Sequence, residues 1–129
     1  MDNSGGKRLQ VLIVDDQPRA RHSLKALLTT LPQVGGFHEA ETGKQAIAFV
    51  EHTTPDLVIM DVRMPEMDGL LAAQHIKTRW PQVKVVLLSM HADYELDAIT
   101  LGADAFVCKG DPPSKLLATL SSVISSCLS

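Results

Sequence analysis

Short apolar stretches alternate with longer amphipathic stretches along most of the chain. The apolar stretches lack a polar face, which is typical of strands that are buried on both sides in a parallel sheet. The pattern predicts five such strands, at residues 9–14, 36–40, 57–60, 83–88 and 105–108.

The stretches between the strands carry apolar residues at helical spacing, and proline or glycine marks most of their ends. They predict helices at residues 18–31, 44–52, 69–80 and 94–101, followed by a last helix that begins at Pro112 or Pro113. Gly102 is expected to close the fourth helix in the left-handed conformation. The last helix should pack through one apolar stripe, formed by Leu116, Leu117, Leu120, Val123, Ile124 and Cys127.

Repeated alternation of strand and helix predicts an α/β fold. Strands that are buried on both faces require helices on each side of the sheet, and parallel strands require right-handed crossovers. We therefore expect a single doubly wound parallel sheet of five strands, in the flavodoxin-like (βα)5 order 2-1-3-4-5. One domain should cover residues 9–129, preceded by a flexible N-terminal head at residues 1–8.

The composition agrees with one globular domain and excludes several other classes. The chain has 129 residues, of which 45% are hydrophobic and only 4% aromatic, so the core should be aliphatic. Its net charge of -3 argues against nucleic-acid binding by this chain alone. Two cysteines are too few for a disulfide framework, and no apolar run approaches the ~20 residues that span a membrane. We expect a cytoplasmic protein that does not bind membranes.

Side chains with useful chemistry follow four of the predicted strands. Asp15 and Asp16 follow the first strand, Asp61 the third, Ser89 the fourth and Lys109 the fifth. Ligands of open parallel sheets bind at the carboxyl ends of the strands, where the strand order reverses. In the order 2-1-3-4-5 the first and third strands are neighbours, so the three aspartates should share one pocket with the serine and the lysine beside it.

Three carboxylates in one pocket repel one another, at a cost on the order of 3 kcal/mol for each pair at ~5 Å and an effective dielectric of ~20. The site therefore needs a proton or a cation. Oxygen ligands favour Mg²⁺, and the pocket offers no histidine or cysteine set for zinc. The ammonium group of Lys109 can bind a phosphoryl group, and the Ser89 hydroxyl can donate a hydrogen bond to the same group. These parts fit phosphoryl transfer to a carboxylate nucleophile.

Plainer interpretations exist for each of these residues taken alone. An aspartate after a strand is commonly a turn residue or a helix cap, and Asp16 lies two residues before Pro18. Lys109 can equally be a solvated residue and Ser89 a turn residue. The agreement of four strand ends favours a shared site.

Other phosphate-binding and catalytic motifs do not match. Gln45 follows Gly43-Lys44 where a P-loop requires serine or threonine. A flavin phosphate would be repelled by Asp15 and Asp16. The chain also has no Ser-His-Asp order with a nucleophile elbow.

Four segments resemble the signature of response-regulator receiver domains (CheY-like) of two-component signalling. They are Val14-Asp15-Asp16, the stretch 61–69 from Asp61 to Gly69, Ser89-Met90 and Lys109. The resemblance covers essentially the whole chain and is greatest to receivers of the LuxR/NarL-type transcriptional regulators. One position departs from the pattern, since Gly110 follows Lys109 where many family members have proline.

The resemblance implies a role for each residue of the acidic pocket. Asp61 is the expected phosphoacceptor, and Lys109 is expected to contact its phosphoryl group. Mg²⁺ should bind Asp16, Asp61 and the backbone carbonyl of Arg63 directly. Asp15 should act on the ion mainly through water.

The same resemblance implies residues that switch the domain and residues that control the lifetime of its phosphorylated state. Ser89 is the expected switch hydroxyl, and Phe106 is the expected aromatic switch, with a plain core phenylalanine as the alternative. Arg63 and His91 should flank the phosphoryl group. Both are bulky, and neither is an obvious base for an attacking water, so they should slow dephosphorylation.

The resemblance also implies partners and an output. A histidine kinase is expected to transfer a phosphoryl group to Asp61 in a Mg²⁺-dependent reaction. The switched output face should control transcription through a C-terminal DNA-binding domain that is not present in this chain. A homodimer that forms on phosphorylation is a further expectation. Such a protein is not an enzyme, apart from its own self-catalysed phosphorylation and dephosphorylation.

Two other functions are less well supported. A Mg²⁺-dependent aspartyl phosphatase needs a second acid two residues after its nucleophile, where this chain has Arg63, and it also needs a cap insertion to hold a substrate. A degenerate receiver that only binds proteins has no need of the intact set of site residues.

Overall fold

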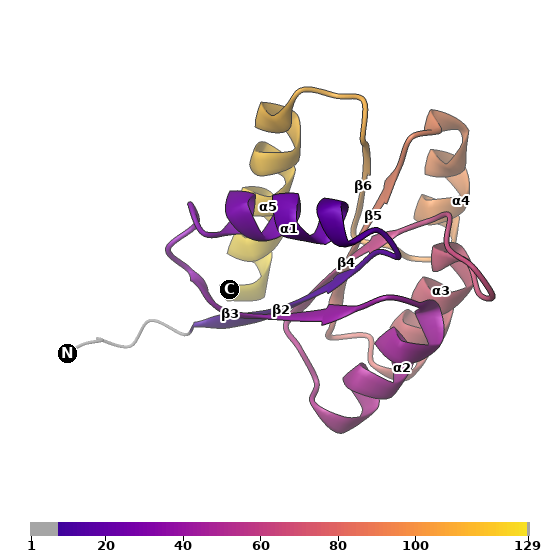
Figure 1. Cartoon of the computed structure of the whole chain (residues 1–129). Coiled ribbons are helices and arrows are strands. Elements are labelled where there is room, and N and C mark those ends of the chain that lie inside the picture. Colours follow the sequence, from indigo (N-terminus) through magenta and orange to yellow (C-terminus); the bar gives the residue numbers. More distant parts are fainter. Residues whose placement is uncertain (1–7, 129) are drawn as a thin grey trace.

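The computed structural model describes residues 8–128 and folds them into one sheet with helices on both faces (Figure 1). The strands are β2 (Leu9–Val14), β3 (Val34–Ala40), β4 (Leu57–Asp61), β5 (Lys84–Ser89) and β6 (Ala105–Cys108). The helices are α1 (Pro18–Leu28), α2 (Gly43–His52), α3 (Gly69–Arg79), α4 (Glu95–Thr100) and α5 (Pro113–Leu128), with a 3-10 turn, η1 (Ala92–Tyr94), before α4. Residues 1–7 of the predicted N-terminal head lie outside the described residues.

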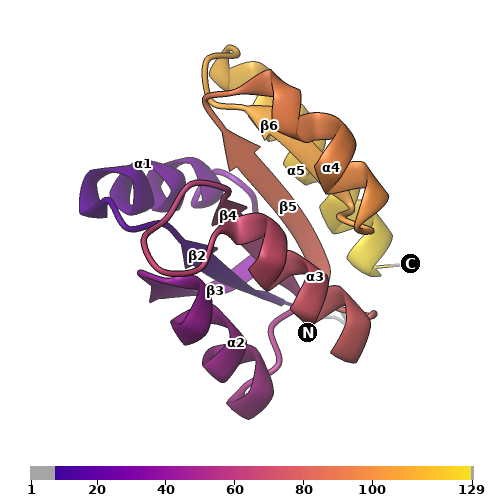
Figure 2. The same ribbon diagram turned by 90° about the vertical axis from the view of Figure 1, so that its right-hand side faces the viewer.

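The five strands are parallel and lie in the order β3-β2-β4-β5-β6. Numbered along the chain, this is the order 2-1-3-4-5, so the prediction of a doubly wound α/β fold is confirmed. α1 and α5 cover one face of the sheet, and α2, α3 and α4 cover the other (Figure 2). β2 and β4 pair directly, which brings the residues that follow them to the same edge of the sheet.

Alternation along the strands divides the core into two layers. In β2, Leu12 and Val14 belong to the layer under α2, α3 and α4, whereas Leu9, Val11 and Ile13 belong to the layer under α1 and α5. All five side chains are completely buried. Burial of such aliphatic side chains stabilises a fold by roughly 1.5–3 kcal/mol each, so the central strands anchor the domain.

The edge strand β3 begins earlier than its sequence predicts. Its first residue is Val34 rather than residue 36, because backbone pairing with β2 extends across Gly35 and Gly36 despite the low strand propensity of glycine. The register shifts by one residue between Leu9 and Gln10, where this pairing begins. Tertiary pairing therefore decides the start of this strand.

Two helices differ from their predicted bounds by more than one residue, whereas α2 begins one residue earlier and α3 ends one residue earlier than expected. α1 ends at Leu28, three residues before the predicted end, and the hydroxyls of Thr29 and Thr30 donate to carbonyl groups in its last turn. In place of the predicted helix 94–101, the turn η1 begins two residues earlier and α4 ends one residue earlier, and Gly102 follows with a φ of 101°, as expected. Among residues 8–128, no helix combines the length and apolarity that a membrane span requires.

The loop between β4 and α3 passes very close to the end of β4. The Gly69 N–H donates to the Val62 carbonyl at 2.7 Å, and a β-carbon on residue 69 would overlap the backbone oxygen of Asp61. Asp68 caps α3, because its side chain accepts a hydrogen bond from the Leu71 N–H at 2.9 Å. Only glycine allows this close approach, which fixes the backbone on which the Asp61 side chain stands.

Candidate functional site

Three carboxylates meet at the carboxyl ends of β2 and β4. Asp15 and Asp16 directly follow β2, and Asp61 is the last residue of β4. One carboxylate oxygen from each lies within 4.8 Å of the other two. Asp15 is 1% exposed and Asp61 8% exposed, so both carboxylates are largely removed from water. The structure thus brings together the three aspartates that the sequence assigned to one pocket.

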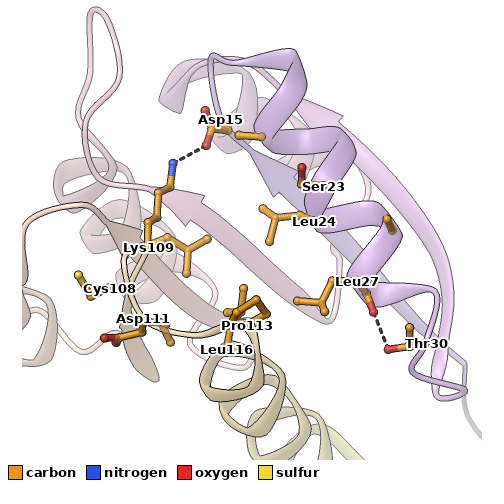
Figure 3. A pocket seen from close by; sticks show the side chains of 14 residues that line it. Asp15, Ser23, Leu24, Leu27, Thr30, Cys108, Lys109, Asp111, Pro113 and Leu116 are labelled. Carbon is orange, nitrogen blue, oxygen red and sulfur yellow. Dashed lines mark hydrogen bonds and ion pairs between the residues drawn. The ribbon is translucent and has the colours of Figure 1, made fainter.

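Lys109 lies between two of these carboxylates. Its Nζ is 2.9 Å from Asp15 Oδ2 and 3.4 Å from Asp61 Oδ2, and Figure 3 shows the lysine reaching Asp15 from the end of β6. The backbone N–H of Lys109 also donates to the Ser89 carbonyl at 2.7 Å, which ties the loop after β6 to the end of β5. The main chain therefore aims the ammonium group into the acidic pocket.

The charges of the pocket are not balanced. Burial raises the pKa of Asp61, and the charge of Asp15 adds to the increase although Lys109 opposes it. Burial alone would lower the pKa of Lys109, but the hydrogen bond to Asp15 and the charges of Asp61 and Asp15 outweigh burial and raise it. The pocket thus combines one ammonium group with three carboxylates. Such an excess of oxygen donors with negative charge fits a hard divalent cation such as Mg²⁺.

The carboxylates of Asp15 and Asp16 have different environments. Asp15 Oδ1 accepts a hydrogen bond from the Gln17 N–H at 2.9 Å while Oδ2 accepts one from Lys109, so both of its oxygens are engaged. Asp16 is more exposed, and Gln17 Nε2 donates to its Oδ2 at 3.3 Å. The N-cap of α1 is Gln17, without a side-chain capping bond. The alternative in which Asp16 serves as the cap of this helix is therefore wrong.

The side chain of Ser89 is fully buried at the end of β5. Its Oγ accepts a hydrogen bond from the His91 N–H at 3.0 Å. Because this bond uses an acceptor position, the hydroxyl keeps its own proton for donation.

The other residues that the sequence singled out lie in β6 and in the loops that follow β4 and β5. Phe106, in β6, is partly buried against the layer under α4 and shares that layer with Tyr94 and Leu101. Arg63 and His91 have exposed side chains in the loops that follow β4 and β5. The His91 ring faces the Tyr94 ring edge-on, with 6.3 Å between centroids.

Two residues near the pocket escape the sequence interpretation. Gly69 is needed for space beside Asp61; the sequence marked it as the last residue of the 61–69 signature and the start of a helix, but gave no sign of this close approach. Arg21 donates from Nη1 to the Asp15 carbonyl at 2.7 Å, and its side chain is only 11% exposed. Arg21 lies three residues before Leu24, on the buried side of α1. A charged residue on the core-facing side of a helix was the available sign that it has a buried partner.

A cavity of about 600 Å³ borders the site between α1 and α5 (Figure 3). Leu24 and Leu27 of α1 and Leu116 of α5 line it, and Asp15 and Lys109 lie at one end. The Lys109–Asp15 ion pair therefore separates an apolar space from the acidic pocket.

A sheet of this order with an acidic pocket beside a lysine defines a class of signalling domain. The chain belongs to the response regulator receiver domain family, whose family model matches residues 11–121. This membership confirms the resemblance on which the sequence interpretation rests.

Relatives of known sequence and structure agree with this assignment. The chain is 34% identical over 113 residues to the transcriptional regulatory protein YhcZ of Bacillus subtilis. The matched region makes up 86% of the chain and 53% of YhcZ. It is 31% identical over 112 residues to the nitrate/nitrite response regulator NarL of Escherichia coli K12, covering 85% of the chain and 52% of NarL. The chain thus spans about half the length of these curated relatives.

Solved structures show the same similarity. A LuxR-family two-component response regulator from Aurantimonas sp. SI85-9A1 superposes with a TM-score of 0.86 at 26% identity, over 93% of this chain and 87% of that one. The expected similarity to receivers of LuxR/NarL-type regulators is therefore confirmed.

We predict that neutralising Asp61 stabilises the fold in metal-free buffer. Its pKa is raised above the ordinary value of 3.8, so between 3.8 and the raised pKa the unfolded chain has lost this proton while the folded protein keeps it. The free energy of unfolding of the wild type therefore falls through this pH window and stays lower above it. Asp61→Asn removes the loss, so the variant should be the more stable protein at neutral pH. Urea titrations in a chelator from about pH 4 to about pH 7 measure the difference. A difference that does not grow with pH would contradict the prediction.

Proposed function

We propose that this receiver is a phosphorylation-controlled switch in which Asp61 accepts a phosphoryl group from a histidine kinase. The observation that carries the proposal is the position of Lys109 Nζ, 2.9 Å from Asp15 and 3.4 Å from Asp61. A positive charge at that point lies beside the expected acceptor and can offset the charge of an incoming phosphoryl group.

In the proposed reaction a carboxylate oxygen of Asp61 attacks phosphorus. An acyl phosphate bond forms while the bond from phosphorus to the kinase histidine nitrogen breaks, and the nitrogen leaves with the electron pair. Lys109 stays charged throughout, because its raised pKa keeps its proton in place. Its ammonium group stabilises the oxygen charge that develops in transfer.

The residues present fit a bound Mg²⁺ ion. Asp16, Asp61 and the backbone carbonyl of Arg63 would hold it directly, and Asp15 would act through water because both of its carboxylate oxygens are already engaged. When bound, the ion supplies positive charge to the phosphoryl oxygens.

A phosphoryl group on Asp61 would bias the buried hydroxyl of Ser89. We propose that this hydroxyl turns to donate to the group, which releases the His91 N–H and leaves room for Phe106 to turn inward. Phe106 shares its layer with residues of η1 and α4, so its rotation would alter that surface.

The output is proposed from the relatives. Several of them are transcriptional regulators, and the chain covers about half of their length. We propose that this receiver acts in the cytoplasm, dimerises on phosphorylation, and controls transcription through a DNA-binding domain rather than by binding nucleic acid itself.

Acetyl phosphate labelling tests the proposal directly. With Mg²⁺, the wild-type protein should gain the mass of one phosphoryl group, and a chelator should prevent the gain. Asp16→Asn should shift the Mg²⁺ titration of this labelling to higher concentration, because one direct ligand loses its charge. Intact-protein mass spectrometry provides the measurement. Labelling that does not depend on Mg²⁺, or an unchanged titration in the variant, would contradict the metal assignment.

The phosphorylated lifetime tests the proposed roles of Arg63 and His91. The double variant Arg63→Asn, His91→Glu should lose its phosphoryl group several-fold faster, because smaller and acidic side chains admit and orient water. The decay rate after donor removal is the measurement. A matched control changes Arg79→Asn and His52→Glu, at the C-terminal ends of α3 and α2, and should decay like the wild type. Equal rates in both double variants would show that neither Arg63 nor His91 controls water access.

A further inference from the structure

Arg21 connects the acidic loop to the neighbouring strand β3. Its Nη1 donates to the Asp15 carbonyl at 2.7 Å, and its Nε donates to Glu39 Oε1 at 2.8 Å. The side chain of Arg21 is 11% exposed, although it belongs to a helix on the surface of the domain. One guanidinium group thus bridges the end of β2 and a carboxylate on β3.

Glu39 holds the guanidinium group in place. It lies beside Ile13 in the pairing of β3 with β2, and its second oxygen accepts a hydrogen bond from Lys25 at 3.1 Å. The hydrogen bonds from Arg21 and Lys25 lower the pKa of Glu39, so the carboxylate stays charged. Lys25 makes this contact from the same helix but has no bond to the acidic loop among the described residues.

The two peptide groups that flank Asp15 are both hydrogen-bonded, one to β3 and the other to Arg21. The Asp15 N–H donates to the Ala40 carbonyl at 3.1 Å, while the Asp15 carbonyl accepts from Arg21. The carbonyl carbon of Asp15 is bonded to the nitrogen of Asp16, so the orientation of this peptide plane determines where the Asp16 carboxylate stands. Arg21 therefore acts on the acidic pair without occupying either of its carboxylates.

We propose that Arg21 is a positioning residue for the cation site, which holds the Asp16 carboxylate toward Asp61 through the Asp15 peptide group. This role rests on the proposed function, since it assigns a task within the same pocket. The planar guanidinium group can donate to two acceptors in fixed directions at once, and a lysine ammonium group cannot reproduce that geometry. The contact with Glu39 orients the guanidinium group of Arg21, so that its Nη1 stays directed at the Asp15 carbonyl.

Direct Mg²⁺ binding to the unphosphorylated full chain, measured by isothermal titration calorimetry, separates positioning from simple stabilisation. Arg21→Gln should weaken Mg²⁺ binding about tenfold, as expected when a partner that orients a ligand is lost. Arg21→Lys should bind with intermediate affinity. Lys25→Gln is the matched control, because it removes the other cation from Glu39 and should leave Mg²⁺ affinity unchanged.

Thermal unfolding of the same variants identifies any general loss of structure. Arg21→Gln should lower the melting temperature more than Lys25→Gln, because Arg21 is nearly buried and loses two hydrogen bonds, so Mg²⁺ affinities are compared at a temperature where both variants are fully folded. Glu39→Gln keeps Arg21 but weakens the ion pair that orients it. This variant should weaken Mg²⁺ binding less than Arg21→Gln does. The double variant Arg21→Gln, Glu39→Gln should bind Mg²⁺ no more weakly than Arg21→Gln alone. Glu39→Gln tests the role independently if Arg21→Gln folds poorly.

The outcomes distinguish this role from the proposed function. Equal Mg²⁺ affinities for wild type, Arg21→Gln and Glu39→Gln would overturn the positioning role while leaving the cation site intact. A wild-type protein that binds no Mg²⁺ would overturn the cation site of the proposed function and the role of Arg21 with it. Weakened binding in Lys25→Gln equal to that in Arg21→Gln would also overturn the role, because it would reduce Arg21 to a general stabiliser of α1.

Discussion

Asp61→Asn should abolish phosphoryl labelling by acetyl phosphate. The amide of asparagine is a poor nucleophile and cannot form the acyl phosphate, and no other carboxylate within residues 8–128 combines the burial of Asp61 with its contact to Lys109 and its place at the end of β4. Intact-protein mass spectrometry after incubation with donor and Mg²⁺ should show complete loss of the added mass.

Asp68→Asn provides the matched control. Asp68 lies in the same loop, but its carboxylate caps α3 through the Leu71 N–H, and asparagine caps a helix almost equally well. This variant should be labelled like the wild type. Labelling of Asp61→Asn at the wild-type level would identify another acceptor and contradict the assignment.

Gly69→Ala should destabilise the domain by about 3 kcal/mol, the upper end of the usual range for overpacking. A β-carbon at this position would overlap the backbone oxygen of Asp61 and lie 3.0 Å from the Val62 Cα, and backbone atoms cannot move aside as a flexible side chain can. The loop would have to give up the hydrogen bond from the Gly69 N–H to the Val62 carbonyl. Urea unfolding measures the loss of stability, and acetyl phosphate labelling should slow because the Asp61 backbone shifts.

Gly110→Ala tests whether glycine loss alone has this effect. A β-carbon on residue 110 would meet only the Cys108 Sγ, at 4.0 Å. Its free energy of unfolding should stay within about 0.5 kcal/mol of the wild type. Similar losses in both variants would show that the crowding beside Asp61 is not the cause.

The strands other than β3 could be predicted to within one residue, because burial on both faces leaves an apolar run that polar residues end. β2 and β6 begin and end where the sequence predicts. β4 ends one residue later than predicted, at Asp61, and β5 lies one residue further along the chain, at Lys84–Ser89. The region of α4 could not be predicted as well. Leu96 and Ile99 are 73% and 59% exposed, and only Ala98 of this helix is buried, so its apolar residues do not report a packed face.

The candidate site was predictable where charged residues follow strands, and it was not predictable where a residue acts through the backbone. Strand order alone brings Asp15, Asp16 and Asp61 together. Arg21 resembles any other charged residue of an amphipathic helix, and its contact is with a carbonyl group that sequence patterns do not describe. The structural role of Gly69 could not be predicted either, because the need for space at this position is visible only once the β4 backbone is placed beside it.

The helices α1 and α5 cover the same face of the sheet although most of the chain separates them. As the chain leaves the ribosome, the face under α2, α3 and α4 can close before α5 has emerged, whereas Val86, Leu88 and Val107 on the opposite face still lack that cover. The 16 residues of α5 emerge over about one to three seconds at the usual rate of translation. The nascent chain therefore presents an uncovered apolar strip along β5 and β6 during that interval, which is the surface where chaperones that bind extended apolar segments would first engage it.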